Sequence, residues 1–378
     1  MLKIFVTGDN HIGKRYDRYP DVKDILIESR FKCIEDMVSY ADSEQCNLFV
    51  VTGDMFDNIS TIKVSDVNRV VNILGQFSGN VLILPGNHDY YTGDEKVWKD
   101  FDKALEKINH NITVLKEMRT YSYEIGDEKI VIYPALCEAK HSDENNLSWI
   151  KEADIEKDGV YNIGIAHGAL KGITPDIEGR YYLMSEAELM EIPVDAWLVG
   201  HTHIPYPDIK DTAVSGYRVF NPGTHEQTDF HNNTVGECFV IEINKSDNET
   251  DITAKRYISG QIRYYDLQLD ISGSEDRILE NELDNLVSEL DSHSIVRARL
   301  KGSVSEQDYE NRKIIYQKVL GRFLSYECAD EELSEKITIE KIRSEYSELS
   351  FVSKLMEKLI DEPVELQMAY ELINQCKE

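Results

Sequence analysis

The chain has 378 residues, of which 41% are apolar, and it carries a formal net charge of −29. This length suffices for two domains and a small appendage, and every apolar run is too short to span a membrane. A chain with this negative charge repels the phosphate backbone of nucleic acids, so its overall charge cannot drive nucleic-acid binding. Any such binding has to be local, metal-assisted or helped by a partner.

The six cysteines are scattered along the chain without Cys-x-x-Cys pairs. This usage is typical of reduced thiols in a cytoplasmic protein. The chain opens on an apolar strand pattern at 1–6, with neither a charged leader nor a small-residue cleavage site, and we expect no signal peptide. We therefore predict a cytoplasmic location (nucleoid or host-cell cytoplasm) and no membrane association.

Strand and helix patterns alternate in the first part of the chain. Apolar β-branched runs predict strands at 2–7, 47–52 and 81–84, and apolar residues at helical spacing predict helices at about 28–43 and 64–74. This βαβαβ order implies parallel strands whose carboxyl ends collect at one edge of a sheet, where α/β proteins bind ligands. Polar side chains that follow these strands directly should converge there. They are Asp9, His11, Asp54, Asp57, Asn87 and His88.

Further strand patterns follow, and three more histidines stand just past two of them. The predicted strands lie at 121–125, 129–133, 161–166, 196–199, 218–220 and 237–243. His167 follows the third of these strands, and His201 and His203 follow the fourth. We predict an α/β fold, a sandwich of two sheets flanked by helices, with every polar cluster on one rim.

The clustered side chains offer carboxylate, amide and imidazole donors without thiolate. Such a set suits Mn, Fe, Zn or Mg rather than a structural zinc site, and two divalent ions can share it if one carboxylate bridges them. Two adjacent ions can clamp a phosphodiester oxygen and lower the pKa of a bridging water. The donor set therefore favours a two-metal site, whereas a lone histidine is more often a core or surface residue.

Five motifs in order, Asp-x-His, Gly-Asp-x-x-Asp, Gly-Asn-His-Asp, His-Gly and Gly-His-x-His, resemble those of the calcineurin-like metallophosphoesterases. The resemblance implies a four-layer α/β/β/α sandwich and two metal sites. One metal would be held by Asp9, His11, Asp54 and His203, and the other by Asp54, Asn87, His167 and His201. His88 matches the catalytic histidine of the family, and Asp57 matches the acidic residue that supports it.

Within this superfamily the chain is similar to DNA-repair nucleases of the SbcD or Mre-eleven type. The narrower likeness rests on motifs at 8–13, 53–57, 199–203, 221–224, 264–270 and 295–301. It implies a 3′-to-5′ exonuclease and single-strand endonuclease that processes DNA ends in repair or recombination. It also implies Mn²⁺ as the ion, a homodimer, and an SbcC-type (Rad-fifty-like) ATPase partner.

Four segments are predicted, with the roles that the resemblance implies: a nuclease domain at 1–260, a small α/β capping domain that guides DNA at 261–329, an acidic linker at 330–348 and a C-terminal helical pair at 349–378. Strand patterns at 263–271 and 295–301 and helix patterns at 275–290 and 306–323 define the capping domain. The helical pair either docks on the ATPase or folds back on its own domain. For DNA backbone contact we predict the loop residues Lys14, Arg15 and Tyr16, whereas Arg297, Arg299 and Lys301 fit a solvated strand face.

Two other functions fit the same motifs. A different metallophosphoesterase would cleave a small phosphodiester or a phosphoprotein, and it would not need the residues after about 260. A non-catalytic scaffold would have lost a ligand or His88, and the sequence retains all of them.

Overall fold

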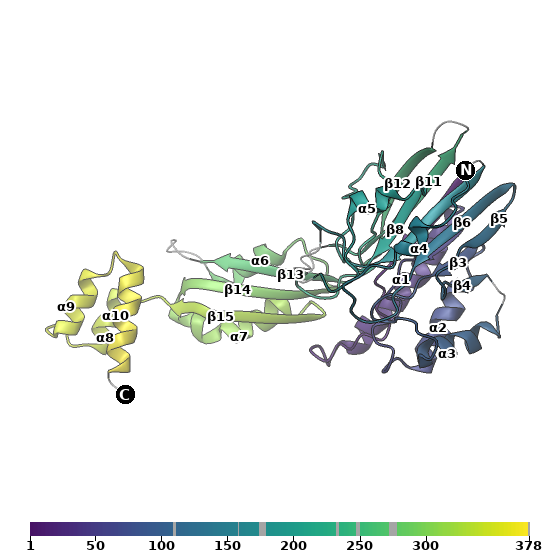
Figure 1. Ribbon diagram of the computed structural model, residues 1–378. Helices are drawn as coiled ribbons and strands as arrows, with labels where there is room; N and C mark the ends of the chain where they lie inside the picture. Colours follow the sequence, from purple (N-terminus) through teal and green to yellow (C-terminus); the bar gives the residue numbers. More distant parts are fainter. Residues whose placement is uncertain are drawn as a thin grey trace. The chain divides into compact units, whose positions relative to one another are not determined.

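The computed structural model of the chain describes residues 1–108, 111–157, 159–173, 179–231, 234–246, 250–271 and 278–376, with only the backbone at 363 and 364. The chain divides into two units, Met1–Tyr264 and Tyr265–Glu378. Each unit is described by itself (Figure 1).

The first sheet of the first unit has the strand order β4-β3-β2-β1-β11-β12-β9. The strands are β1 (Leu2–Thr7), β2 (Leu48–Val51), β3 (Asn80–Ile83), β4 (Ile112–Val114), β9 (Val214–Ser215), β11 (Glu237–Lys245) and β12 (Thr250–Ile258). β1 to β4 are parallel neighbours, whereas β11 pairs antiparallel with β1. The predicted βαβαβ arrangement is confirmed, so the loops after β1, β2 and β3 leave the sheet at the same edge.

The second sheet has the strand order β10-β8-β7-β6-β5. Its strands are β5 (Tyr121–Ile125), β6 (Glu128–Ala135), β7 (Val160–His167), β8 (Ala196–Gly200) and β10 (Val219–Phe220). β6, β7, β8 and β10 run parallel, and β5 closes the predicted hairpin with β6.

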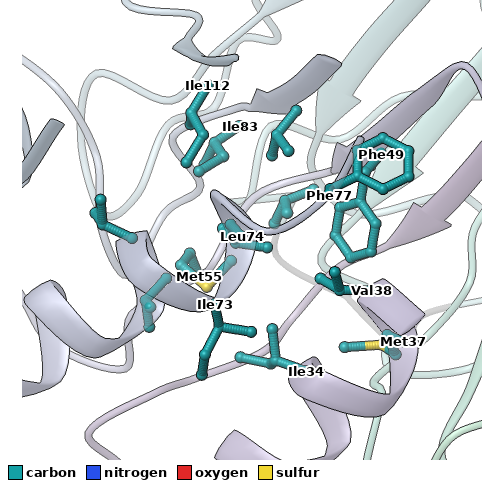
Figure 2. Close-up of a cluster of buried hydrophobic side chains, with 14 of the residues drawn as sticks. Ile34, Met37, Val38, Phe49, Met55, Ile73, Leu74, Phe77, Ile83 and Ile112 are labelled. Carbon is teal, nitrogen blue, oxygen red and sulfur yellow. The ribbon is translucent and has the colours of Figure 1, made fainter. Parts of the chain in front are cut away.

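Helices cover the outer faces of both sheets. Against the first sheet lie α1 (Lys23–Ser43), α2 (Val64–Leu74) and α3 (Lys96–Leu105), and they share a core with it in which Ile34, Leu74 and Phe49 are buried (Figure 2). Against the second lie the short helices α4 (Ser148–Lys151) and α5 (Glu186–Glu191). A separate apolar cluster lies between the two sheets. The predicted α/β/β/α sandwich is confirmed.

The second unit begins with a small α/β fold. Its sheet has the order β13-β14-β15, with β13 (Arg263–Asp270), β14 (Ser294–Val304) and β15 (Ser325–Glu335). α6 (Leu279–Val287) and α7 (Glu306–Leu320) pack on this sheet. The predicted helix at 275–290 coincides with α6 in part, and its residues 275–277 lie outside the described residues.

The prediction of an acidic linker at 330–348 is wrong. Its first residues complete β15, which pairs with β14 in parallel, and α8 (Ile339–Glu345) follows. β15 forms although it is acidic because Leu333 is buried in the core, while Asp330 accepts a hydrogen bond from Arg312 Nε at 3.0 Å. Asp330 is half-buried, and Glu331 and Glu332 are exposed where the pairing of β14 and β15 shifts register.

Two helices form at 349–378 as predicted, and together with α8 of the predicted linker they make a group of three helices. They are α8, α9 (Phe351–Lys358) and α10 (Pro363–Gln375), and they bury Ile342, Met356 and Leu366 in a core of their own. The apolar residues of these three short helices are therefore buried against one another rather than against the sheet of the second unit.

Candidate metal centre

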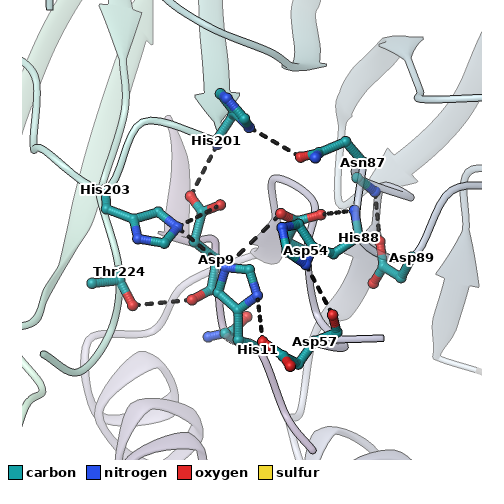
Figure 3. Close-up of polar contacts among 12 residues, drawn as sticks. Asp9, His11, Asp54, Asp57, Asn87, His88, Asp89, His201, His203 and Thr224 are labelled. Atoms are coloured by element: carbon teal, nitrogen blue, oxygen red, sulfur yellow. Dashed lines mark hydrogen bonds and ion pairs between the residues drawn. The ribbon is translucent and has the colours of Figure 1, made fainter. Parts of the chain in front are cut away.

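The seven residues predicted to hold metal lie at the carboxyl ends of five strands. Figure 3 labels Asp9, His11, Asp54, Asn87, His201 and His203 among them. Asp9 and His11 follow β1, Asp54 follows β2, and Asn87 follows β3. His167 ends β7, and His201 and His203 follow β8. Three groups of side chains form, and within each group the possible ligand atoms lie within 4.8 Å of one another. The groups are Asp9, His11 and His203; Asp54, His167 and His201; and His11, Asp57 and His88.

The backbone turns sharply at these residues. Asp9, His11, Asp54 and His201 have φ angles of 50°, 44°, 53° and 93°, in the left-handed region that few side chains adopt. Gly53 has φ 107°, and a Cβ there would lie 2.1 Å from Nδ1 of His167. Glycine is therefore needed at position 53 to admit the imidazole beside the turn.

The first group leaves a buried carboxylate oxygen without a hydrogen bond. Asp9 Oδ1 has no hydrogen-bond partner among the described residues, and Nε2 of His203 lies 3.6 Å from it. Nε2 of His11 lies 3.1 Å from Nε2 of His203. An orphaned buried oxygen beside two facing imidazole nitrogens is the arrangement that a bound cation satisfies.

The second group converges on Asn87, whose Oδ1 lies 2.9 Å from Nε2 of His167 and 3.0 Å from Nδ1 of His201. Asp54 lies between the two groups. Its Oδ2 is 3.4 Å from Nε2 of His167 and 3.9 Å from Nε2 of His11, and its Oδ1 accepts a hydrogen bond from the backbone N–H of His88 at 2.8 Å. One carboxylate thus faces both sets of donors.

The electrostatics suit a divalent cation. Burial alone would raise the pKa of Asp54, but His167 and His11 outweigh it and lower that pKa. Burial and the charge of His167 lower the pKa of His201 to about 4, so this ring is neutral and offers a lone pair. Burial opposes protonation of His167, yet the carboxylate of Asp54 raises its pKa to about 9. A metal ion bound at this place would replace the extra proton on the His167 ring.

His88 is oriented by Asp57, but not as predicted. Nδ1 of His88 lies 2.9 Å from the backbone carbonyl oxygen of Asp57, whereas the carboxylate of Asp57 lies 3.4 Å from Nδ1 of His11. The side chain of Asp57 therefore supports His11, and its main chain supports His88. Burial opposes ionisation of Asp57, but the contact with His11 outweighs it and the pKa of Asp57 is lowered.

The predicted DNA-contact loop is only partly exposed. Tyr16 is buried, and its hydroxyl accepts a hydrogen bond from Arg30 Nη1 at 3.3 Å, so it cannot contact DNA and that prediction is wrong. Tyrosine carries enough apolar area to fill the core here once its hydroxyl is paired. Arg15 is exposed and Lys14 is half-buried. Burial and the charge of Arg30 lower the pKa of Lys14.

The basic residues of β14 are paired with acids. Arg299 forms an ion pair with Asp266 at 2.6 Å, and Lys301 forms one with Asp270 at 3.0 Å. Arg297 lies 3.3 Å from both Asp266 and a carboxylate oxygen of Glu327. These contacts agree with the predicted solvated strand face.

Sequence reasoning missed two buried supports of the site, Asp89 and Arg30. Asp89 closes the turn after β3, because Oδ1 accepts a hydrogen bond from Gly86 N at 2.7 Å and Oδ2 accepts one from Phe56 N at 3.0 Å. Arg30 lies one helical turn before Ile34, on the apolar face of α1. A charged residue on an otherwise apolar helix face is a sequence signal for a buried, paired charge, and this signal could have identified Arg30.

Replacing Asp89 with Asn is expected to destabilise the protein by about 1–3 kcal/mol, because the amide NH₂ would face one of the two buried backbone N–H groups. Urea unfolding at pH 8 measures the loss, since burial and the charge of Asp54 raise the pKa of Asp89 to about 7. Asp94→Asn, at a side chain that is 98% exposed, is the control. Equal stability of the two variants would contradict this role.

Comparison with known proteins gives one family. The family whose model matches the chain is described as calcineurin-like phosphoesterase, and the match covers residues 2–205, more than half of the chain. No curated protein matches the sequence. Among the described residues, no helix combines the length and apolar character needed to cross a membrane.

Three solved structures share low identity with the chain. The calcineurin-like phosphoesterase YfkN from Bacillus subtilis is 14% identical over 68% of this chain and 90% of its own, with a TM-score of 0.39. Purple acid phosphatase PPD1 from yellow lupin is 14% identical over 53% of this chain and 38% of its own, with a TM-score of 0.35. A dimetal phosphatase from Danio rerio is 10% identical over 58% of this chain and 86% of its own, with a TM-score of 0.33.

Proposed function

Because the chain belongs to the calcineurin-like phosphoesterase family and is thus a metal-dependent phosphoester hydrolase, we propose that it is a DNA nuclease that processes DNA ends. The observation that carries the proposal beyond phosphoester hydrolysis is the second unit, Tyr265–Glu378. An enzyme for a small phosphoester does not need an added α/β fold and three further helices. The motif resemblance to SbcD-type nucleases extends into this unit, at 264–270 and 295–301.

Members of the family use dinuclear metal centres, and we propose two Mn²⁺ ions here. Asp9, His11 and His203 would hold one, Asn87, His167 and His201 the other, and Asp54 both; the intermediate position of Asp54 supports this division. When bound, such ions polarise a phosphoryl oxygen and lower the pKa of water so that it can attack phosphorus.

The chain itself would supply orientation and proton transfer. The carbonyl oxygen of Asp57 can only accept, so Nδ1–H of His88 donates to it, which fixes the tautomer with a proton on Nδ1 when the ring is neutral. In the protonated ring, Nε2 can then donate to a phosphoryl oxygen or to the departing sugar oxygen. Lys14, half-buried in the loop after His11, and the exposed Arg15 are the cations we propose for contact with a DNA phosphate.

We propose that the three C-terminal helices bind an SbcC-type ATPase. Four large apolar side chains support this, because they remain exposed although the helices have a core of their own: Leu349 at 83%, Phe351 at 78%, Met368 at 58% and Leu372 at 60%. Exposed apolar residues on short helices suit docking against an apolar stripe of another helix. The homodimer stays a prediction.

Truncation after Lys336 is expected to abolish association with the SbcC-type ATPase of the same genome while metal binding persists. The cut falls beyond Leu333, the last core residue of the preceding sheet, so it removes the helical core whole. Size-exclusion chromatography of the mixed proteins measures association. Phe351→Ser in the full chain is the matched variant, and undiminished association of the truncated protein would contradict the proposal.

DNA and a generic substrate compared side by side test the nuclease proposal. With Mn²⁺, the purified chain is expected to degrade end-labelled DNA and to hydrolyse bis(p-nitrophenyl) phosphate more slowly. One observation favours a second candidate, hydrolysis of a small phosphodiester or a phosphoprotein: the net charge of −29 opposes approach of a polyanion. If the chain hydrolyses the generic ester rapidly and leaves the labelled DNA undegraded, the second function is the correct one.

A further inference from the structure

The turn that carries Asp9 and His11 is held from outside by two side chains. The carbonyl oxygen of Asp9 accepts a hydrogen bond from Thr224 Oγ1 at 3.0 Å. The next carbonyl oxygen, that of Asn10, accepts one from Arg30 Nε at 3.0 Å and a second from Nη2 of the same guanidinium. Because Asp9 and His11 both have positive φ, the turn is not one that the backbone adopts readily without such support.

Arg30 is an unusual residue to find at this place. It lies on α1, is only 2% exposed, and lies among the supports of the candidate metal centre rather than at the surface. A buried guanidinium is costly unless its charge is offset and its N–H groups are paired. Tyr16 takes one N–H at 3.3 Å, and the negative charge of Glu226 acts on the guanidinium.

Glu226 is itself held firmly. It is 2% exposed, and its Oε1 accepts hydrogen bonds from Ser29 Oγ at 2.6 Å and from the backbone N–H groups of Gln261 and Ile262 at 3.2 Å each. The guanidinium thus bonds to one carbonyl oxygen, and the charge of a firmly held carboxylate acts on it. Its planar fork allows both N–H groups to reach that oxygen, which the single ammonium of lysine cannot reproduce.

We propose that Arg30 is a positioning residue of the metal centre, which fixes the Asp9–His11 turn and thereby sets the affinity of the site that these two residues share with His203. The inference rests on the proposed two-ion centre. Arg30 would act through the Asn10 carbonyl, without contact to a metal or a substrate.

The other site should be affected much less. Its ligand His167 is oriented by a contact between Nδ1 and the carbonyl oxygen of Thr52 at 2.8 Å, and Asn87 stands on the turn that Asp89 closes. Neither contact involves α1. A loss confined to one ion would therefore distinguish positioning from general destabilisation.

Titration of the metal-free full chain with Mn²⁺, by calorimetry and by electron paramagnetic resonance of the coupled ion pair, tests the proposal. In Arg30→Gln we expect one of two binding steps to weaken by about 10- to 100-fold, the usual loss for a residue that supports a ligand, and the other to change by less than about threefold. Arg30→Lys should lie between this variant and the wild type. The coupled signal should return at high Mn²⁺ concentration.

Glu28→Gln is the matched control, because Glu28 lies two residues away on α1 and its side chain, paired with Arg69, is 62% exposed. Unchanged binding in Arg30→Gln, or equal weakening of both steps, would overturn the role of Arg30. If Arg30→Gln does not fold, Arg30→Lys decides by the same criterion. A wild-type chain that binds fewer than two ions would overturn the two-ion centre itself, and with it the inference.

Discussion

Replacing Asp54 with Asn is expected to weaken both metal sites together and to remove nearly all hydrolytic activity. Asp54 is 1% exposed and faces His167 on one side and His11 on the other. Asn keeps the shape and the left-handed backbone but removes the charge that a pair of cations requires. Substitution of a residue that only supports a metal ligand typically lowers metal affinity by about 10- to 100-fold. Because Asp54 is itself a proposed ligand, we expect its substitution to lower metal affinity by more than about 100-fold.

Elemental analysis after gel filtration, together with Mn²⁺ titration, measures this effect. His203→Ala is the comparison, since its ring lies beside Asp9 and His11 and should serve only one ion. We expect that variant to retain one ion of two. Full occupancy of both sites in Asp54→Asn would refute the bridging role.

His88→Gln is expected to leave both metals bound and to lower the hydrolysis rate by about two to four orders of magnitude, the usual loss of a general acid. The backbone N–H of His88 donates to the Asp54 carboxylate, a contact that Gln retains, whereas the ring faces the Asp57 carbonyl and packs edge-on against the His11 ring, 4.8 Å between centroids. Substitution of the ring therefore leaves the Asp54 ligand in place. Single-turnover rates at saturating substrate report the chemical step.

Asp57→Asn separates the two contacts of that residue. Its carbonyl oxygen remains to orient His88, so the single-turnover rate should fall far less than in His88→Gln. Its carboxylate contacts His11, so metal affinity should weaken instead. A His88→Gln variant that loses its metals, or one with wild-type turnover, would show that the ring has another role.

The sequence predicts the candidate site well because the site depends on topology. Parallel strands end at one edge, so polar residues after β1, β2 and β3 have to meet, and no knowledge of side-chain packing is needed. Burial of individual residues is a different matter. Tyr16 reads as a loop residue, but its ring enters the core and its hydroxyl pairs with Arg30.

Acidic composition misled the prediction for β15. Three consecutive acidic residues at 330–332 read as a solvated linker, because a strand is recognised by its apolar alternation. The strand forms since β14 supplies a partner edge and Leu333 anchors it, both of which depend on residues distant in sequence. Local pattern cannot register such tertiary support.

The left-handed backbone at Asp9 and Asp54 also constrains which acid can serve as a ligand. Of the residues with a carboxylate, aspartate tolerates this conformation better than glutamate, because its short side chain can bond to the adjacent main chain. A glutamate would have to accept an unfavourable φ and would carry its oxygens one methylene away from the positions that the aspartate oxygens take. Asp→Glu at either position, conservative by charge, is therefore a severe change in this fold.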